Sequence, residues 1–158
     1  MNYPLLAINE ALSLLPSKMT TRAALVQLLA IGAQESQDYN YRRQMGNGPA
    51  RGFWQFEENG GVKGVMEHPL KIVRDLARQV CAARNCPWDR EVIWGNLEFD
   101  DVLAAAFARL NLYGDPFALP AVGQCNAAWE LYLRVWRPGK PHPDKWPARY
   151  AAAVLACA

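Results

Sequence analysis

The sequence has 158 residues, of which 51% are hydrophobic and 20% are charged, and it includes six tryptophans. This composition excludes a disordered or low-complexity chain, and the length suits one domain that buries its own core. The net charge of +2 is too small to indicate a nucleic-acid-binding protein. We therefore expect one globular domain over residues 1–158.

The N-terminal segment lacks the features of a signal peptide. No basic residue precedes Lys18, and polar residues interrupt the apolar positions before Pro16. No stretch of about 18 apolar residues is long enough to cross a membrane. We expect a protein that is made in the cytoplasm, does not insert into membranes, is a monomer, and keeps its four cysteines as buried free thiols.

Apolar positions recur at helical spacing along most of the chain. A short helix is expected over about 4–14. The next segment starts with capping threonines at Thr20 and Thr21, and its apolar positions predict a helix that ends near Glu35. Further helices are predicted over 70–84, over 101–113 behind an Asp100 cap, over 124–136 and over 146–156, with a turn or two between Pro87 and Asn96. The predicted fold class is all-α, with six or seven helices.

Residues 38–64 break this helical pattern. They contain six glycines and Pro49, and they show no periodic run longer than a few residues. We expect a long loop with room for a small β-hairpin. Its aromatic residues argue against disorder, and a long ordered loop within a compact domain is often functional. The functional site is therefore expected here.

Glu35 is the first candidate for that site. It lies seven positions after Leu28 and three after Gly32, within roughly 20° of the apolar face of its helix. Burial would raise the pKa of its carboxyl, as a general acid at neutral pH requires. Alternatively, the side chain turns into solvent at the helix end, or pairs with Arg42 or Arg43.

Two motifs in this region resemble those of a known enzyme family. Glu35-Ser36 is followed by Gly52-Phe53-Trp54-Gln55-Phe56, with 20 residues from Glu35 to Gln55. This order resembles that of goose-type lysozymes and lytic transglycosylases of the lysozyme superfamily. The stretch Ile31–Gly64 is also similar to small phage cell-wall-degrading proteins.

This resemblance implies a lysozyme-like fold and an enzyme that cleaves the bond between N-acetylmuramic acid and N-acetylglucosamine in peptidoglycan. It implies that Glu35 is the catalytic acid and base, that Ser36 braces the site, and that Gly52 and Gln55 shape the sugar cleft. Trp54, beside Gln55, is expected to point inward, with sugar contact as the alternative. A phage enzyme would act on the periplasmic wall after release, or from within a virion.

A third family motif, Ala-Tyr-Asn-Ala-Gly, is only partly matched. The nearest string is Gln124-Cys125-Asn126-Ala127-Ala128-Trp129, in which Asn126 and Ala127 correspond. The resemblance therefore implies that Asn126 binds substrate. The aromatic residue facing the acid is Trp129, Tyr132 or Tyr113, and the sequence does not choose among them.

Single-glutamate enzymes of this family close a 1,6-anhydro ring on muramic acid, so the resemblance favours lytic transglycosylase chemistry. The alternatives are a hydrolytic lysozyme and a non-catalytic virion protein with the same fold. A hydrolase would use a second carboxylate, from Asp38, Glu57 or Glu58. No cofactor or metal is implied, since the two histidines are too few for a metal site.

Two basic clusters complete the candidates. Arg42, Arg43 and Arg51 could meet the lactyl or peptide carboxylates of the wall, or form ordinary surface charge. The Pro-rich turn over residues 136–142 is interpreted as a tail folded on the core, with substrate or partner binding as the alternative.

Overall fold

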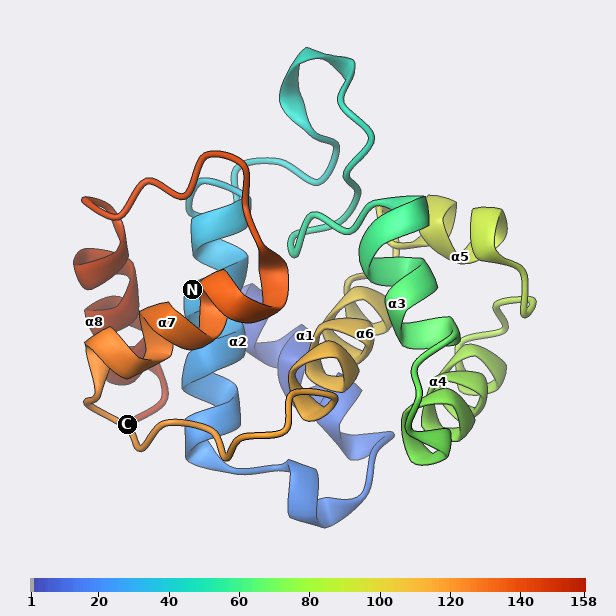
Figure 1. The fold of residues 1–158 in the computed structure, drawn as a ribbon, viewed down its shortest axis with the longest axis horizontal. Coiled ribbons are helices and arrows are strands. Elements are labelled where there is room, and N and C mark those ends of the chain that lie inside the picture. The colour runs from blue at the N-terminus through green and yellow to red at the C-terminus, as the bar shows by residue number, and fades with distance from the viewer. Residues whose placement is uncertain (1) are drawn as a thin grey trace.

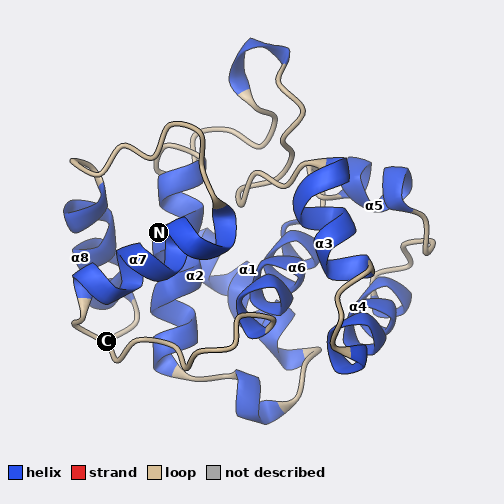
Figure 2. Ribbon diagram, in the orientation of Figure 1, coloured by secondary structure: helices blue, strands red, loops and turns tan. Residues whose placement is uncertain are grey.

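The computed structural model describes residues 2–158, within which it contains eight α-helices and no β-strand (Figure 1, Figure 2). The helices are α1 (Asn2–Ser13), α2 (Arg22–Glu35), α3 (Lys63–Met66), α4 (Lys71–Ala83), α5 (Arg90–Asn96), α6 (Asp101–Tyr113), α7 (Cys125–Trp136) and α8 (Trp146–Ala156). The all-α prediction is confirmed, whereas the predicted number of six or seven helices is too small, because α3 was not expected. Every predicted helix is present, and its ends differ from the prediction by a few residues at most.

Helix α6 forms the centre of the molecule. All of its residues from Asp101 to Leu110 are buried. Eight of these ten are alanines or large apolar residues, and the two charged ones, Asp101 and Arg109, hydrogen-bond to other parts of the chain. Helices α1 and α4 pack against it, and α2 packs between α1 and α8. In Figure 1, α6 lies between a group formed by α2, α7 and α8 and a group formed by α3, α4 and α5.

Side-chain caps fix where the two longest buried helices begin. The Asp100 carboxylate accepts a hydrogen bond from the Leu103 amide at 3.0 Å, so the predicted cap of α6 is confirmed. The Thr21 hydroxyl accepts one from the Ala24 amide at 3.1 Å, so α2 begins at Arg22. Helix α2 then ends at Glu35, after a run of buried residues, and its last side chain lies at the edge of the core.

The structure corrects two expectations about residues 38–64. Helical structure begins before the predicted end of the loop, with a π-helical turn over Glu58–Val62 that continues into α3. Val62 and Val65, three positions apart, are both buried and anchor it. The glycines at 60, 61 and 64 conceal this helix in the sequence, since glycine is a poor helix former.

The predicted hairpin is the second correction. Within residues 2–158 it is reduced to two isolated bridges, which pair Arg51 with Arg43 on one side and with Phe56 on the other. Gly46 and Gly52 have positive φ angles of 73° and 77°, which end each extended stretch after a few residues. The segment is therefore irregular and is held by single pairings.

Two other expectations concern the cysteines and the membrane. All four cysteines are free thiols. Cys81 and Cys86 are buried as predicted, whereas Cys125 and Cys157 are partly exposed, so the expected burial is wrong for these two. No helix in residues 2–158 combines the length and the apolar character needed to cross a bilayer.

Candidate active site

A cleft of about 910 Å³ opens at the end of α2. One side, which we call the acid wall, is formed by the ends of α2 and α7, residues 137–145 and the start of α8. The other side, which we call the glycine wall, is formed by residues 55–64. Figure 1 shows these segments meeting between the two helix groups. The cleft is at the upper end of ordinary small-molecule sites, and its size suits a segment of a polymer.

Glu35 lies on the acid wall with its carboxyl in the cleft. The Tyr132 hydroxyl donates a hydrogen bond to its Oε1, and the Tyr41 hydroxyl donates to its backbone carbonyl at 2.9 Å. Burial raises the pKa of Glu35 to about 7, and the hydrogen bond from Tyr132 opposes part of that rise. At neutral pH the carboxyl therefore holds a proton for a large fraction of the time, as a general acid requires.

The alternative ion pairs for Glu35 are not formed. The Nε and Nη2 atoms of Arg42 both donate to the Asp101 carboxylate at 2.8 Å, and Arg43 pairs with Glu98 at 3.1 Å. The Arg51 guanidinium stacks on the indole of Trp94, and its Nε lies 3.8 Å from the Glu98 carboxylate. These three arginines are engaged by groups of the protein itself, so their predicted role as ligands for wall carboxylates gains no support.

Of the three aromatic candidates, only Tyr132 contacts the acid. Its ring stacks on Trp146 at 5.5 Å and packs against Trp129 at 5.3 Å, so the phenol is held rigidly. Burial raises the pKa of Tyr132 far above its usual range, which keeps the hydroxyl protonated as a donor. Tyr113 lies outside the cleft, with its ring beneath Lys18 at 5.9 Å.

Ser36 braces the end of α2. The residue is fully buried, and its hydroxyl donates to the Gly32 carbonyl at 2.6 Å and accepts from the Tyr39 amide at 3.0 Å. Residues 37–39 follow with positive φ angles of 48°, 63° and 65°. Left-handed backbone is costly for non-glycine residues, so this sharp turn depends on the bonds that Ser36 makes. Ser36 thus fixes where Glu35 lies without lining the cleft.

Trp54 points into the core, as predicted. Its side chain is 1% exposed, and its indole nitrogen donates to the Leu28 carbonyl at 2.9 Å. Its backbone carbonyl accepts from the Trp136 indole at 2.9 Å, which joins the loop to the acid wall. Trp54 therefore supports the cleft from behind, and its ring offers no surface to a sugar.

Of the two loop residues expected to shape the cleft, Gln55 lies on the glycine wall, whereas Gly52 is buried and does not line the cleft. Gly52 has a φ of 77°, and a Cβ there would lie 2.7 Å from the Leu97 carbonyl oxygen, so no other residue fits without a shift. Gln55 lines the cleft. Its amide nitrogen donates to the Gly52 carbonyl at 2.9 Å and to the Arg42 carbonyl at 3.2 Å.

Asn126, by contrast, is exposed near the start of α7 and does not line the cleft. Asn111 and Arg149 are among the residues that line the cleft but were not expected from the sequence. Asn111 carried a signal, because it is an isolated amide in the mostly apolar second half of helix α6. Arg149 carried none, since charged residues on the last helix are ordinary.

The three candidates for a second carboxylate have different surroundings. Asp38 pairs with Arg149 at 2.9 Å, and Glu58 lies 3.4 Å from Arg90. Glu57 is exposed, lines the cleft, and forms no ion pair with any residue in 2–158. Glu57 is therefore the one of the three that both shares the cleft with Glu35 and is free to act there.

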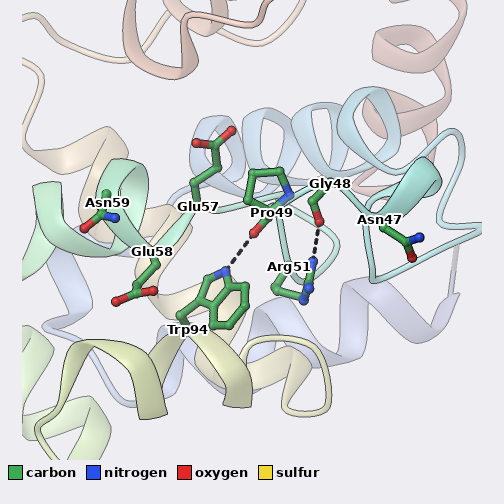
Figure 3. Close-up of a pocket in the computed structure, with 8 residues that line it drawn as sticks. All are labelled: Asn47, Gly48, Pro49, Arg51, Glu57, Glu58, Asn59 and Trp94. Atoms are coloured by element: carbon green, nitrogen blue, oxygen red, sulfur yellow. Dashed lines mark hydrogen bonds between the residues drawn. The ribbon is translucent and has the colours of Figure 1, made fainter.

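A second cavity of about 300 Å³ adjoins the cleft, and Glu57 lines both (Figure 3). Its other side is formed by Trp94, whose indole nitrogen donates to the Pro49 carbonyl at 2.8 Å. The Arg51 guanidinium stacks on the same indole at 4.6 Å. The cavity extends the surface available to a long ligand past the glycine wall.

Comparison with known protein families, with curated proteins and with solved structures finds no match for this chain. Within residues 2–158, no three His, Cys, Asp or Glu side chains are grouped so that they could hold a metal ion. The cleft contains the Glu35 carboxyl with its raised pKa, the Tyr132 hydroxyl that is hydrogen-bonded to it, and the exposed carboxylate of Glu57. This set of groups suits proton transfer.

Proposed function

We propose that this protein is a lysozyme-like glycosidase that degrades peptidoglycan, with Glu35 as its general acid. The observation that carries the proposal is the Glu35 carboxyl, which lies in a large cleft. Its pKa is raised to about 7, and it accepts a hydrogen bond from the Tyr132 hydroxyl. The resemblance of Glu35-Ser36 and Gly52–Phe56 to the lysozyme superfamily supports the same assignment. The bond cleaved is that between N-acetylmuramic acid and N-acetylglucosamine. The protein would reach the periplasmic cell wall after its release from the cytoplasm, or as part of a virion.

In the proposed reaction, protonated Glu35 gives its proton to the glycosidic oxygen as the bond from that oxygen to the muramic acid C1 breaks. Tyr132 orients the carboxyl. The Glu35 carboxylate then takes the proton of the muramic acid 6-hydroxyl while that oxygen attacks C1. The products are a 1,6-anhydromuramic end and a free N-acetylglucosamine hydroxyl, and no water is consumed.

Hydrolysis is the second candidate, and the position of Glu57 favours it. An exposed carboxylate in the same cleft could activate a water molecule or stabilise the cation that forms at C1. The products would then end in ordinary reducing sugars. The two mechanisms share Glu35 as the acid and differ in what attacks C1.

The test is a digest of purified peptidoglycan by the wild type, by Glu35→Gln and by a control, with products identified by mass spectrometry. Wild-type products should be anhydro ends, each lighter by one water than a reducing end, and Glu35→Gln should release almost none. Glu91→Gln, at an exposed position outside the cleft, is the matched control and should behave as the wild type. Reducing ends alone would identify a hydrolase, and no products from the wild type would indicate a non-catalytic wall-binding or virion protein.

A further inference from the structure

The acid wall carries a strip of positive charge. Residues 137–145 contribute three basic side chains, Arg137, Lys140 and Lys145, against one acidic side chain, Asp144. All three basic residues line the cleft. The strip follows the end of α7 directly and lies on the orange-to-red loop that leads from α7 to α8 across the upper left of Figure 1.

This strip is tied to the residue next to the acid. Gln34 is buried, and its amide nitrogen donates to the Pro141 carbonyl at 2.7 Å and to the His142 carbonyl at 3.1 Å. Its amide oxygen accepts from Arg149 at 3.1 Å. Because prolines at 138, 141 and 143 further restrict the backbone, the basic side chains have a set position relative to Glu35.

The basic side chains of the strip are not neutralised by strong ion pairs with other described residues. Arg137 and Lys140 form no ion pair with any residue in 2–158, and Lys145 has only an exposed contact of 3.8 Å with its neighbour Asp144. Such surface contacts are worth little. Arg137 also has a left-handed φ of 50° just after a helix, where glycine or asparagine is favoured.

We propose that Arg137, Lys140 and Lys145 bind the carboxylates of the peptide stems on the glycan, so that stem-bearing strands are preferred over bare glycan. The inference rests on the proposed function. N-acetylated sugar rings are neutral, whereas each stem carries several carboxylates beside the bond to be cut. The exposed Glu57 on the glycine wall would repel those carboxylates, so the charge distribution directs the stems toward the basic strip and fixes the orientation of the strand.

The test compares two substrates: soluble glycan strands with their stems, and the same strands after an amidase has removed the stems and left the lactyl carboxylate. The wild type should cleave stem-bearing strands faster. The triple variant Arg137→Gln, Lys140→Gln, Lys145→Gln should lose about tenfold on them and far less on stripped strands. A second triple variant, Lys18→Gln, Lys71→Gln, Arg78→Gln, removes the same charge outside the cleft and should keep the wild-type preference.

A binding measurement separates this inference from the proposed activity. In the Glu35→Gln background, calorimetry should show tighter binding of stem-bearing than of stripped oligomers, and the strip substitutions should abolish the difference. Equal losses on both substrates, or no loss, would overturn the inference. Tight binding of stripped strands would assign the strip to the lactyl carboxylate and overturn it as well. If the wild type cleaves nothing but the binding difference remains, the proposed activity fails and the stem site stands.

Discussion

The two walls of the cleft present the same functional group in opposite surroundings. On the acid wall, Glu35 is partly buried, hydrogen-bonded to Tyr132, and has its pKa raised to about 7. On the glycine wall, Glu57 is exposed and is followed by a π-helical turn that contains two adjacent glycines. The packing of α7 and α8 behind Glu35 creates the difference. Two carboxyls of one cleft can thus have separate roles, set by their environment and not by their chemistry.

The largest expected effect comes from replacing each carboxyl in turn. Glu35→Gln should lower the rate of peptidoglycan cleavage by about 10²- to 10⁴-fold, because the amide keeps the shape of the acid but has no proton to transfer. Glu57→Gln should lower it by less than about threefold if ring closure by the substrate is the mechanism. The measurement is the release of soluble muropeptides from purified peptidoglycan.

Equal losses of activity in Glu35→Gln and Glu57→Gln would contradict the separate roles assigned to the two carboxyls. Combined with products that end in reducing sugars, an equal loss would make Glu57 the group that activates or positions water. Since Glu57 is exposed, its replacement should leave the melting temperature unchanged, and any loss would then be catalytic.

The next largest effect is on stability, and its sign follows from the pKa of Glu35. That pKa rises from its usual 4.5 in an unfolded chain to about 7 in the folded protein. Between these values the folded state keeps a proton that the unfolded state has lost. The stabilising contribution is therefore fully present below pH 4.5 and is lost as the pH rises to about 7, by up to roughly 3 kcal/mol.

Urea unfolding of the wild type and of Glu35→Gln at several pH values measures this contribution. The glutamine variant does not titrate, so its stability relative to the wild type should increase between pH 4.5 and 7.5. A difference that stays constant with pH would mean that the carboxyl is well solvated. The contrast with Glu57 would then disappear.

Most of the fold could be predicted from the sequence, because apolar periodicity and helix caps are local signals. The segment around α3 could not. Its helix is short, and glycines occupy the positions at 60, 61 and 64. Gly61 is explained by how the loop folds back, since a Cβ there would lie 2.7 Å from the ring of Phe56, five residues earlier. A glycine that is required by close packing against a ring looks, in the sequence, like a residue of a flexible loop.

The same division applies to the site. Glu35 could be predicted because both its place on the apolar face and its motif are local. The choice of Tyr132 over Tyr113 depends on how α7 packs beside the end of α2, which no local pattern encodes. The link from Gln34 to the Pro141 carbonyl joins residues 107 positions apart. The basic strip could therefore be noticed in the sequence but not placed in the cleft.

The third prediction tests the phenol that distinguishes the acid wall. Tyr132→Phe removes the hydrogen bond that lowers the pKa of Glu35, so this pKa should rise further. The upper limit of the pH–rate profile should move to higher pH, while the maximal rate falls about tenfold because the carboxyl is less well oriented. The measurement is kcat/KM against pH on soluble glycan strands.

Tyr41→Phe is the matched control for this experiment. Its hydroxyl donates to the backbone carbonyl of Glu35 and not to the carboxyl, so its loss should move the profile less. Identical profiles for Tyr132→Phe and the wild type would show that the phenol does not tune the acid. Tyr132 would then be a packing residue beneath Trp146.

The smallest effect is expected at Gln55, which asks whether the glycine wall contacts substrate at all. Gln55→Ala removes two hydrogen bonds to backbone carbonyls and should cost about 1 kcal/mol of stability. A domain of ordinary stability remains almost entirely folded after such a loss. A drop of about fivefold in activity would therefore report lost contact with the glycan.

Gln44→Ala is the control, since Gln44 also lines the cleft and accepts a hydrogen bond within the same loop, from the Ala50 amide at 3.0 Å. Equal losses in both variants would trace the effect to loop order, and a change confined to stability would make Gln55 a structural residue.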